Sequence, residues 1–331
     1  MNTLVRNGIS LYCDSYLALK KPLFWKTSSL YIKLCALSYA FEGHNADPDT
    51  LLDAIDFIKK NSGTFSYLRS ARVYSAAYLT AGKRNIESEF PRLTHCYDVM
   101  KKAGFSSSSY LPIAAYALYS TTPKGLELSK AETAKLIYEA MKKQHRFLTS
   151  SDDYASAVIL ASSDRPISEM MQECEETYQL LKASGLWSGN GLQFLSQILV
   201  FDPASPNIKA ERCKAIADRL KQYKNRVSSM HYSTIGFFAL TGEHWQEAIN
   251  EALEAVELIK EKKCYKFDGR EFNLMLAAAL VCMGYLAQKD STDAMILRIG
   301  VGTIVQAIVA AQAVACATAA SAAAAASSSS S

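Results

Sequence analysis

A period of about forty residues runs through this chain and constrains its fold more than any other feature. Seven times, an aromatic or apolar anchor residue is followed by a Ser-, Thr-, Asp- or Gly-rich turn and then by an apolar run that ends in leucine. The anchors are Phe24, Phe65, Phe105, Phe147, Trp187, Val227 and Phe267. The run-ending leucines are Leu37, Leu79, Leu118, Leu160, Leu199, Leu240 and Leu280. Because a fixed period of this length is typical of repeat architectures, the sequence predicts one continuous repeat domain.

Each repeat divides into two helical segments, which we name A and B. The A segment precedes the anchor and carries apolar residues at helical spacing before a final lysine, as in Tyr138, Met141 and Lys142. The B segment follows the anchor, begins with a residue able to cap a helix and is almost uncharged beyond its first turn. Expected B helices include 28–41, 107–119, 152–161 and 270–286. Pro91 is expected in the first turn of its A helix, where proline is tolerated.

A helix that is apolar nearly all round must be buried on more than one side, so we expect B helices inside and A helices outside. The predicted fold is therefore all-α, an α-solenoid of helical hairpins or, if its ring closes, an α/α toroid. We divide the chain into a seven-fold helical-hairpin repeat domain at 1–290, an Ala-rich C-terminal helix at 291–321 and a disordered Ala/Ser tail at 322–331.

The Ala-rich helix is uncharged from Ile299 onward, and two locations are open to it. It can cover the apolar faces of the B helices as a cap or plug, which would bury Val305, Ile308 and Val309. Alternatively, its uncharged run is long enough to cross a bilayer. We expect the first arrangement, because alanine is only marginally apolar and Gln306 and Gln312 interrupt the run.

Charge and cysteine usage exclude several classes of protein. The chain has 36 basic and 32 acidic residues, without the clustered basic face that a nucleic-acid-binding protein needs. Its eight cysteines show no CxxC and no paired short spacing, which indicates free thiols in a reducing compartment and not a zinc site. The N-terminus has no secretory pattern. We expect a cytoplasmic protein that uses no cofactor and no metal.

The A-to-B turns hold the candidate site. A stack of hairpins would place all of them on one rim, where the lysines that end the A helices lie beside the B-helix N-termini. Each feature has an ordinary cause in helix capping, but together they would make an electropositive rim suited to an anion. The lysines are Lys20, Lys59, Lys101, Lys142, Lys182, Lys221 and Lys260. The candidate ligand-binding residues are Arg69, Arg72, Ser150, Asp152, Asp153, Asn190, His231, Asp268 and Arg270.

Asp152 and Asp153 are the most conspicuous pair in this set. Two carboxylates could bind a hard cation or share acid–base work. Adjacent residues point about 100° apart on a helix, however, so a role in capping the following helix is favoured. The glycine-rich turns at 188–191 and 267–270 lack phosphate-loop spacing, and the histidines form no HxxxH or HExxH motif.

Several segments together resemble a known family. They are LYCDSY at 11–16, SSSYL at 107–111, LTSSDDY at 148–154 and the Ala-rich tail. This combination is similar to a bacterial family, mostly from Gram-positive species, that is filed as domain of unknown function 4003. The resemblance covers essentially the whole chain and implies a cytosolic bacterial protein. It implies no activity, cofactor or catalytic residue.

The sequence favours a non-enzymatic interaction or ligand-binding protein that uses the A-to-B turns or the concave B-helix surface. Its partner would be an unknown protein or a small anionic ligand, and not a nucleic acid. The alternative is an α/α-toroid enzyme in which Asp152, Asp153, Asn190, His231 and Asp268 converge on one pocket. A tail-anchored adaptor is a third class, which would reach a membrane only through the C-terminal tail.

Overall fold

The computed structural model describes residues 1–223, 231–264 and 269–289, together with 296, 298, 300–302 and 305. Within these residues the chain is helical with connecting turns, and no strand occurs. The prediction of an all-α fold is confirmed.

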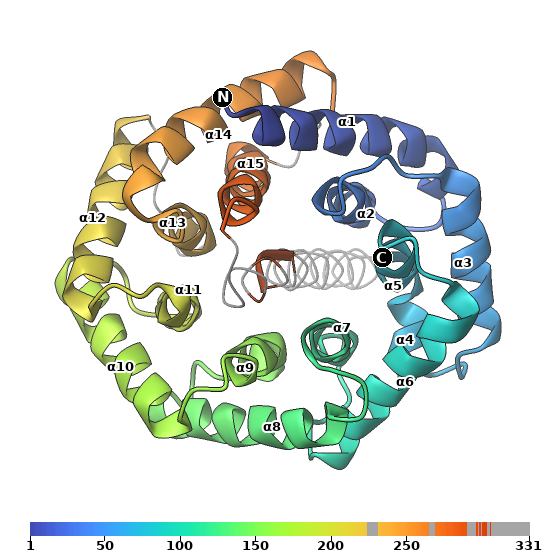
Figure 1. Ribbon diagram of the computed structural model, residues 1–331, viewed down its shortest axis with the longest axis horizontal. Helices are drawn as coiled ribbons and strands as arrows, with labels where there is room; N and C mark the ends of the chain where they lie inside the picture. The colour runs from blue at the N-terminus through green and yellow to red at the C-terminus, as the bar shows by residue number, and fades with distance from the viewer. Residues whose placement is uncertain are drawn as a thin grey trace, which may run out of the picture.

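Two concentric layers of helices form a ring (Figure 1). The outer layer consists of the A helices α1 (Thr3–Leu23), α3 (Pro48–Lys60), α6 (Ile86–Lys102), α8 (Glu127–Gln144), α10 (Ile167–Ala183), α12 (Pro206–Gln222) and α14 (Trp245–Glu261). The inner layer consists of the B helices α2 (Ser29–Phe41), α5 (Arg72–Ala81), α7 (Leu111–Thr121), α9 (Tyr154–Ala161), α11 (Asn190–Ile198), α13 (Tyr232–Ala239) and α15 (Gly269–Leu286). Short elements in the turns are α4 (Tyr67–Ser70), η1 (Ser151–Asp153), η2 (Leu199–Phe201) and η4 (Gly242–His244).

Hydrophobic patterning explains the two layers. In α9, every residue except Ser156 is buried, because this helix packs on its own A helix, on neighbouring B helices and on the interior of the ring. In α10, by contrast, buried residues such as Met170, Cys174 and Leu181 occupy one stripe, and charged residues face outward. A helix buried on several sides needs apolar residues all round, whereas an outer helix needs only one apolar face.

The ring is closed by contacts between its first and last repeats. The Met1 amino group lies 3.5 Å from the Glu254 carboxylate, and the Asn2 N–H donates to Glu251 Oε1 at 2.7 Å. Between α1 and α15, a Cβ atom at Gly284 would lie only 2.8 Å from Val5 Cγ2, so glycine permits the close approach of these helices. The sequence left the choice between an open solenoid and a toroid undecided. These contacts bring the first and last repeats together, as the ring in Figure 1 shows.

The described residues of the C-terminal segment lie inside the ring (Figure 1). A Cβ at Gly300 would contact Ile159 of α9 at 3.4 Å, and one at Gly302 would contact Phe41 of α2 at 3.6 Å. Val301 and Val305 are fully buried. Ile308 and Val309, like most of 291–321 and all of 322–331, lie outside the described residues. Among the described helices, none is both long enough and apolar enough to span a bilayer.

The two helices of a repeat are joined by a recurring polar contact at the B-to-A rim. A cation in the N-terminal half of an A helix, or in the turn before it, donates to a carbonyl at the C-terminal end of the B helix of the same repeat, where the helix dipole is negative. The donor–acceptor pairs are Arg92–Thr122 at 2.7 Å, Lys130–Ala161 at 3.0 Å, Arg165–Val200 at 3.1 Å and Arg212–Ala239 at 3.3 Å. The repeated contact satisfies carbonyls that the helix itself leaves unpaired.

The expectation for Pro91 is wrong. Helix α6 begins at Ile86, with the Asn85 side chain accepting from the N–H groups of Glu87 and Ser88, so Pro91 lies inside the helix. Asparagine is a stronger start signal than a proline six residues later, and the proline removes one intrahelical hydrogen bond.

Candidate functional site

The two rims of the ring are built from different turns. Each A helix leads into its B helix at the A-to-B rim. In the described residues this rim comprises the turns 24–28, 61–71, 103–110, 145–153 and 184–189, with 223, 231 and 262–264 of the last two turns. Each B helix leads into the next A helix at the B-to-A rim, which comprises the turns 42–47, 82–85, 122–126, 162–166, 199–205 and 240–244. The predicted site residues that the structure describes belong to the A-to-B rim.

Arg69 and Arg72 support the backbone of the second repeat. The Arg69 guanidinium donates to the carbonyl oxygens of Lys59 at 2.6 Å and Ser62 at 3.1 Å, which fixes the turn after α3. Arg72 donates to the carbonyl of Arg69 at 2.8 Å. Both arginines therefore bind backbone carbonyls of their own repeat, and both side chains are half-exposed.

Ser150, Asp152 and Asp153 form one compact cluster at the start of α9. The Ser150 N–H donates to Asp153 Oδ2 at 2.9 Å, and the Ser150 hydroxyl donates to Asp152 Oδ1. Asp153 is only 8% exposed. Burial, and next the charge of Asp152, raise the pKa of Asp153 to about 7, against the lowering effect of the Ser150 hydrogen bond. The capping role that the sequence favoured is thus realised, with an unusual pKa added.

The remaining candidates belong to later repeats. Asn190 is exposed at the first position of α11, and His231 is buried with its Nε2 atom 3.8 Å from Glu271 Oε1. Asp268 and the side chain of Arg270 lie outside the described residues. Among Arg69, Arg72, Asn190 and the Ser150 cluster, no hydrogen bond or ion pair joins one repeat to another. Convergence of these described residues on one point stays a prediction.

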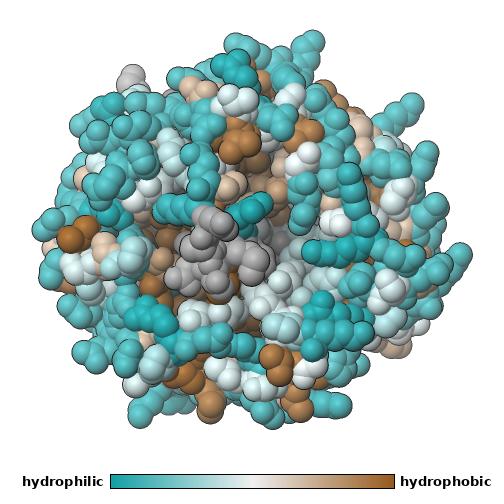
Figure 2. Space-filling model, in the orientation of Figure 1, coloured by the Kyte–Doolittle hydropathy of each residue, from teal (hydrophilic) through white to brown (hydrophobic). Residues whose placement is uncertain are grey.

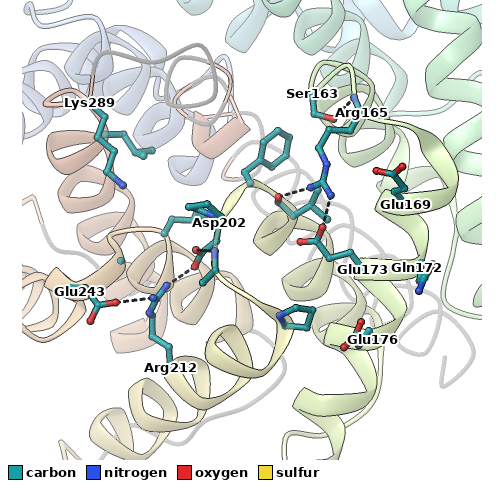
Figure 3. A pocket seen from close by; sticks show the side chains of 18 residues that line it. Ser163, Arg165, Glu169, Gln172, Glu173, Glu176, Asp202, Arg212, Glu243 and Lys289 are labelled. Atoms are coloured by element: carbon teal, nitrogen blue, oxygen red, sulfur yellow. Dashed lines mark hydrogen bonds and ion pairs between the residues drawn. The ribbon is translucent and has the colours of Figure 1, made fainter.

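A cavity lies on the opposite, B-to-A rim and was not anticipated. It has a volume of about 1030 Å³ and spans three successive turns, from α9–α10 through α11–α12 to α13–α14 (Figure 3). Its charged lining residues are Arg165, Glu169, Glu173, Glu176, Asp202, Arg212, Glu243 and Lys289. Val200, Phe201, Leu240 and Leu286 supply apolar lining.

Two ion-pair networks hold the walls of this cavity. Glu173 pairs with Arg165 at 2.6 Å and with the buried Lys209, so one carboxylate ties α10 to α12. The second network is centred on Arg212, which pairs with Asp202 at 2.5 Å and with Glu243 at 3.0 Å. Figure 3 shows the Arg165–Glu173 pair and the Arg212 network on facing sides of the cavity. Charge-assisted bonds of this kind fix the positions of the turns more firmly than neutral bonds would.

Glu169 and Glu176 differ from the other acidic residues of the cavity. Both are exposed on α10, and neither makes an ion pair with a described residue. Glu169, Glu173 and Glu176 follow the i, i+4, i+7 spacing of one helical face. This spacing is the one sequence signal that could have pointed to the cavity, since its other members come from separate repeats.

Comparison with known proteins agrees with the family resemblance. The profile of DUF4003, described as a protein of unknown function, matches residues 15–314. The chain belongs to the DUF4003 family. It is also similar to the uncharacterized protein YeaA of Bacillus subtilis (strain 168). The two sequences are 25% identical over 311 residues, which cover 92% of this chain and 91% of YeaA. No solved structure gives a significant match.

Neither comparison supplies an activity for this DUF4003 member. Among the described residues, no group of three or more His, Cys, Asp or Glu side chains is placed to hold a metal ion. The functional argument therefore rests on the geometry of the two rims.

Proposed function

We propose that this protein is a non-enzymatic binding scaffold, and that its B-to-A cavity takes an extended segment of a partner protein carrying basic side chains. The observation that supports this most directly is the pair Glu169 and Glu176, which lie on one wall of a cavity spanning three repeats and make no ion pair with any residue that the structure describes. Their carboxylates would attract ammonium or guanidinium groups.

The dimensions of the cavity suit a short peptide segment. Packed helices lie about 8–10 Å apart, so three successive turns extend over roughly 20 Å. An extended chain covers that length with about six residues. The apolar lining from Phe201, Leu240 and Leu286 would contact alternate side chains of such a segment.

The interior of the ring is a less favourable binding surface. Val301 and Val305 of the C-terminal segment are buried there, and the segment contacts both α9 and α2. A ligand on the concave B-helix surface at this position would have to displace them. A ligand in the cavity on the B-to-A rim would not have to displace Val301 or Val305.

The test uses labelled six-residue peptides with lysine or glutamate at alternate positions, titrated by fluorescence anisotropy. We expect the lysine peptides to bind at least about tenfold more tightly than the glutamate peptides. Glu169→Lys with Glu176→Lys should abolish this preference. The matched control is Glu87→Lys, an exposed acid in the first turn of α6 on the same rim. Absence of a preference, or equal loss in the control, would refute the proposal.

Asp153 favours a second candidate function. A carboxyl group whose pKa is about 7 could donate or accept a proton at neutral pH, as the toroid-enzyme alternative requires. Its hydrogen bond to the Ser150 N–H already serves the start of α9. Comparing the stability of Asp153→Asn with that of wild type at several pH values tests the structural role of this carboxyl group.

A further inference from the structure

Large aromatic side chains face solvent along the A-to-B rim. Phe65 is 99% exposed, Phe147 97%, Trp25 92% and Trp187 81%. They occupy the turns of the first, second, fourth and fifth repeats. In the third turn, Phe105 is instead buried against the rings of Tyr138 and Tyr154. Single exposed apolar residues are common, but residues at or next to the anchor position of four turns on one rim form a pattern.

Basic residues are adjacent in sequence to two of these aromatic residues and are numerous on the rest of the rim. Lys26 follows Trp25 and Arg146 precedes Phe147 in sequence, and both are exposed. Further exposed cations at the same rim are Lys21, Lys59, Lys60, Lys101, Lys102, Lys142, Lys143, Lys182, Lys221, Lys262 and Lys263. Acidic residues among the described part of this rim are Asp152, Glu261, Glu271 and the buried Asp153. The rim is therefore electropositive.

The opposite rim has a different character. Its turns and the helix ends beside them expose acidic residues, Glu42, Glu87, Asp164, Glu169 and Glu243, together with the basic residues Lys83, Lys124, Arg165 and Lys289, so its charges are mixed. In Figure 2, hydrophilic residues cover most of the periphery of the face that is seen, with hydrophobic residues toward the interior of the ring. Because the ring is viewed down the shortest axis of the molecule in Figure 1, its two rims are its broad faces.

The distribution of the aromatic residues selects the kind of partner. They are spread around the circumference of a closed ring, so a compact ligand could not contact all four, whereas a flat surface could. They are also separated by polar turn residues, unlike the contiguous apolar centre of a protein interface. Tryptophan and phenylalanine at the edge of the hydrocarbon region, with lysine at the level of the phosphates, is the arrangement found on bilayer surfaces.

We propose that the A-to-B rim binds face-on to an anionic lipid bilayer. Trp25, Phe65, Phe147 and Trp187 enter the headgroup region, and the neighbouring lysines and arginine contact anionic headgroups. This places the peptide-binding cavity on the side that faces away from the membrane. Membrane binding is independent of the proposed peptide binding, because the aromatic and basic residues of the A-to-B rim are different from the residues that line the cavity.

The test measures binding of the full chain to vesicles by co-sedimentation. One set of vesicles contains phosphatidylcholine alone, and the other contains about one third phosphatidylserine. We expect binding to the anionic vesicles only, decreasing as salt is raised. Replacing the four aromatic residues by alanine should weaken binding about tenfold or more. The side chains are exposed, so the fold should be unaffected, which circular dichroism would verify.

The control variant replaces Leu126, Leu136 and Ile208 by alanine, since these are exposed apolar side chains away from the A-to-B rim. Tryptophan fluorescence gives a second readout, because Trp25 and Trp187 are two of only three tryptophans. In a Trp245→Phe background, anionic vesicles should shift the emission to the blue. No binding at low salt, equal binding to neutral vesicles, or equal loss in the control variant would overturn the proposal. Binding that the alanine variant retains would also overturn it.

Discussion

Replacing Asp153 by asparagine should stabilise the protein at alkaline pH and much less in acid. Asparagine keeps an oxygen that can accept from the Ser150 N–H, but it cannot become charged. The variant therefore removes a buried charge while it preserves the cap of α9.

The magnitude follows from the pKa of Asp153, which rises from an ordinary 3.8 to about 7 in the folded chain. Each pKa unit corresponds to about 1.4 kcal/mol. The raised pKa of Asp153 therefore lowers the free energy of unfolding by about 4 kcal/mol at pH 8. The helix dipole favours a carboxylate at this position by about 0.3–1 kcal/mol, which leaves about 3 kcal/mol. The sign is that of an acid whose folded pKa is raised: the loss begins near pH 4, grows as pH rises and is complete above pH 7.

The assay is urea unfolding of wild type and Asp153→Asn at pH 4.5 and pH 8. We compare the two free energies of unfolding at each pH, because the contributions of the other titrating groups are the same in both proteins and cancel in the difference. We expect the variant to be more stable by about 3 kcal/mol at pH 8 and by about 1 kcal/mol at pH 4.5. The matched control, Asp152→Asn, removes a charge that raises the pKa of Asp153 and should shift the titration to lower pH. A variant that is less stable than wild type at pH 8, or a gain independent of pH, would refute the reasoning.

Three further perturbations test the packing. Arg212→Ala leaves the buried Asp202 carboxylate without its partner and should cost about 3 kcal/mol in urea unfolding, partly restored by adding Asp202→Asn. Gly284→Ala places a Cβ against Val5 and should lower stability by about 1–3 kcal/mol, whereas Val5→Ala in the same chain should relieve the clash. Cys35, Cys96, Cys174 and Cys282 are buried and burial raises each thiol pKa to about 12, so a thiol-specific reagent should modify them only after denaturant is added, as mass spectrometry would show.

Periodicity predicted the helices well, because each local rule agreed with the repeat. The expected segments 28–41 and 152–161 correspond to α2 (Ser29–Phe41) and to η1 with α9 (Tyr154–Ala161). The start of α6 was misplaced because a proline was weighted above the Asn85 cap. Closure of the ring could not be predicted, since it depends on small rotations between repeats that accumulate over the whole chain.

The candidate site was predictable only as a location. Arg69 and Asp152 could be assigned to turns between an A and a B helix from the repeat pattern, but their hydrogen bonds to Lys59 and Ser150 depend on side-chain direction. The sequence could not predict the cavity, because Arg212 lies ten residues from Asp202 and in a different repeat from Glu173. Such residues meet only when adjacent turns are brought together by the ring.

The closed ring is the central claim, and zero-length carbodiimide crosslinking of the monomeric protein tests it most directly. This reagent joins amines to carboxylates that are already in contact. The account predicts linked peptides between Met1 and Glu254, and between Lys262 and Asp14, whose charged atoms lie 3.5 Å and 3.6 Å apart. A monomer in which neither pair is linked, while pairs within one repeat such as Lys135 and Glu139 are linked, would contradict it.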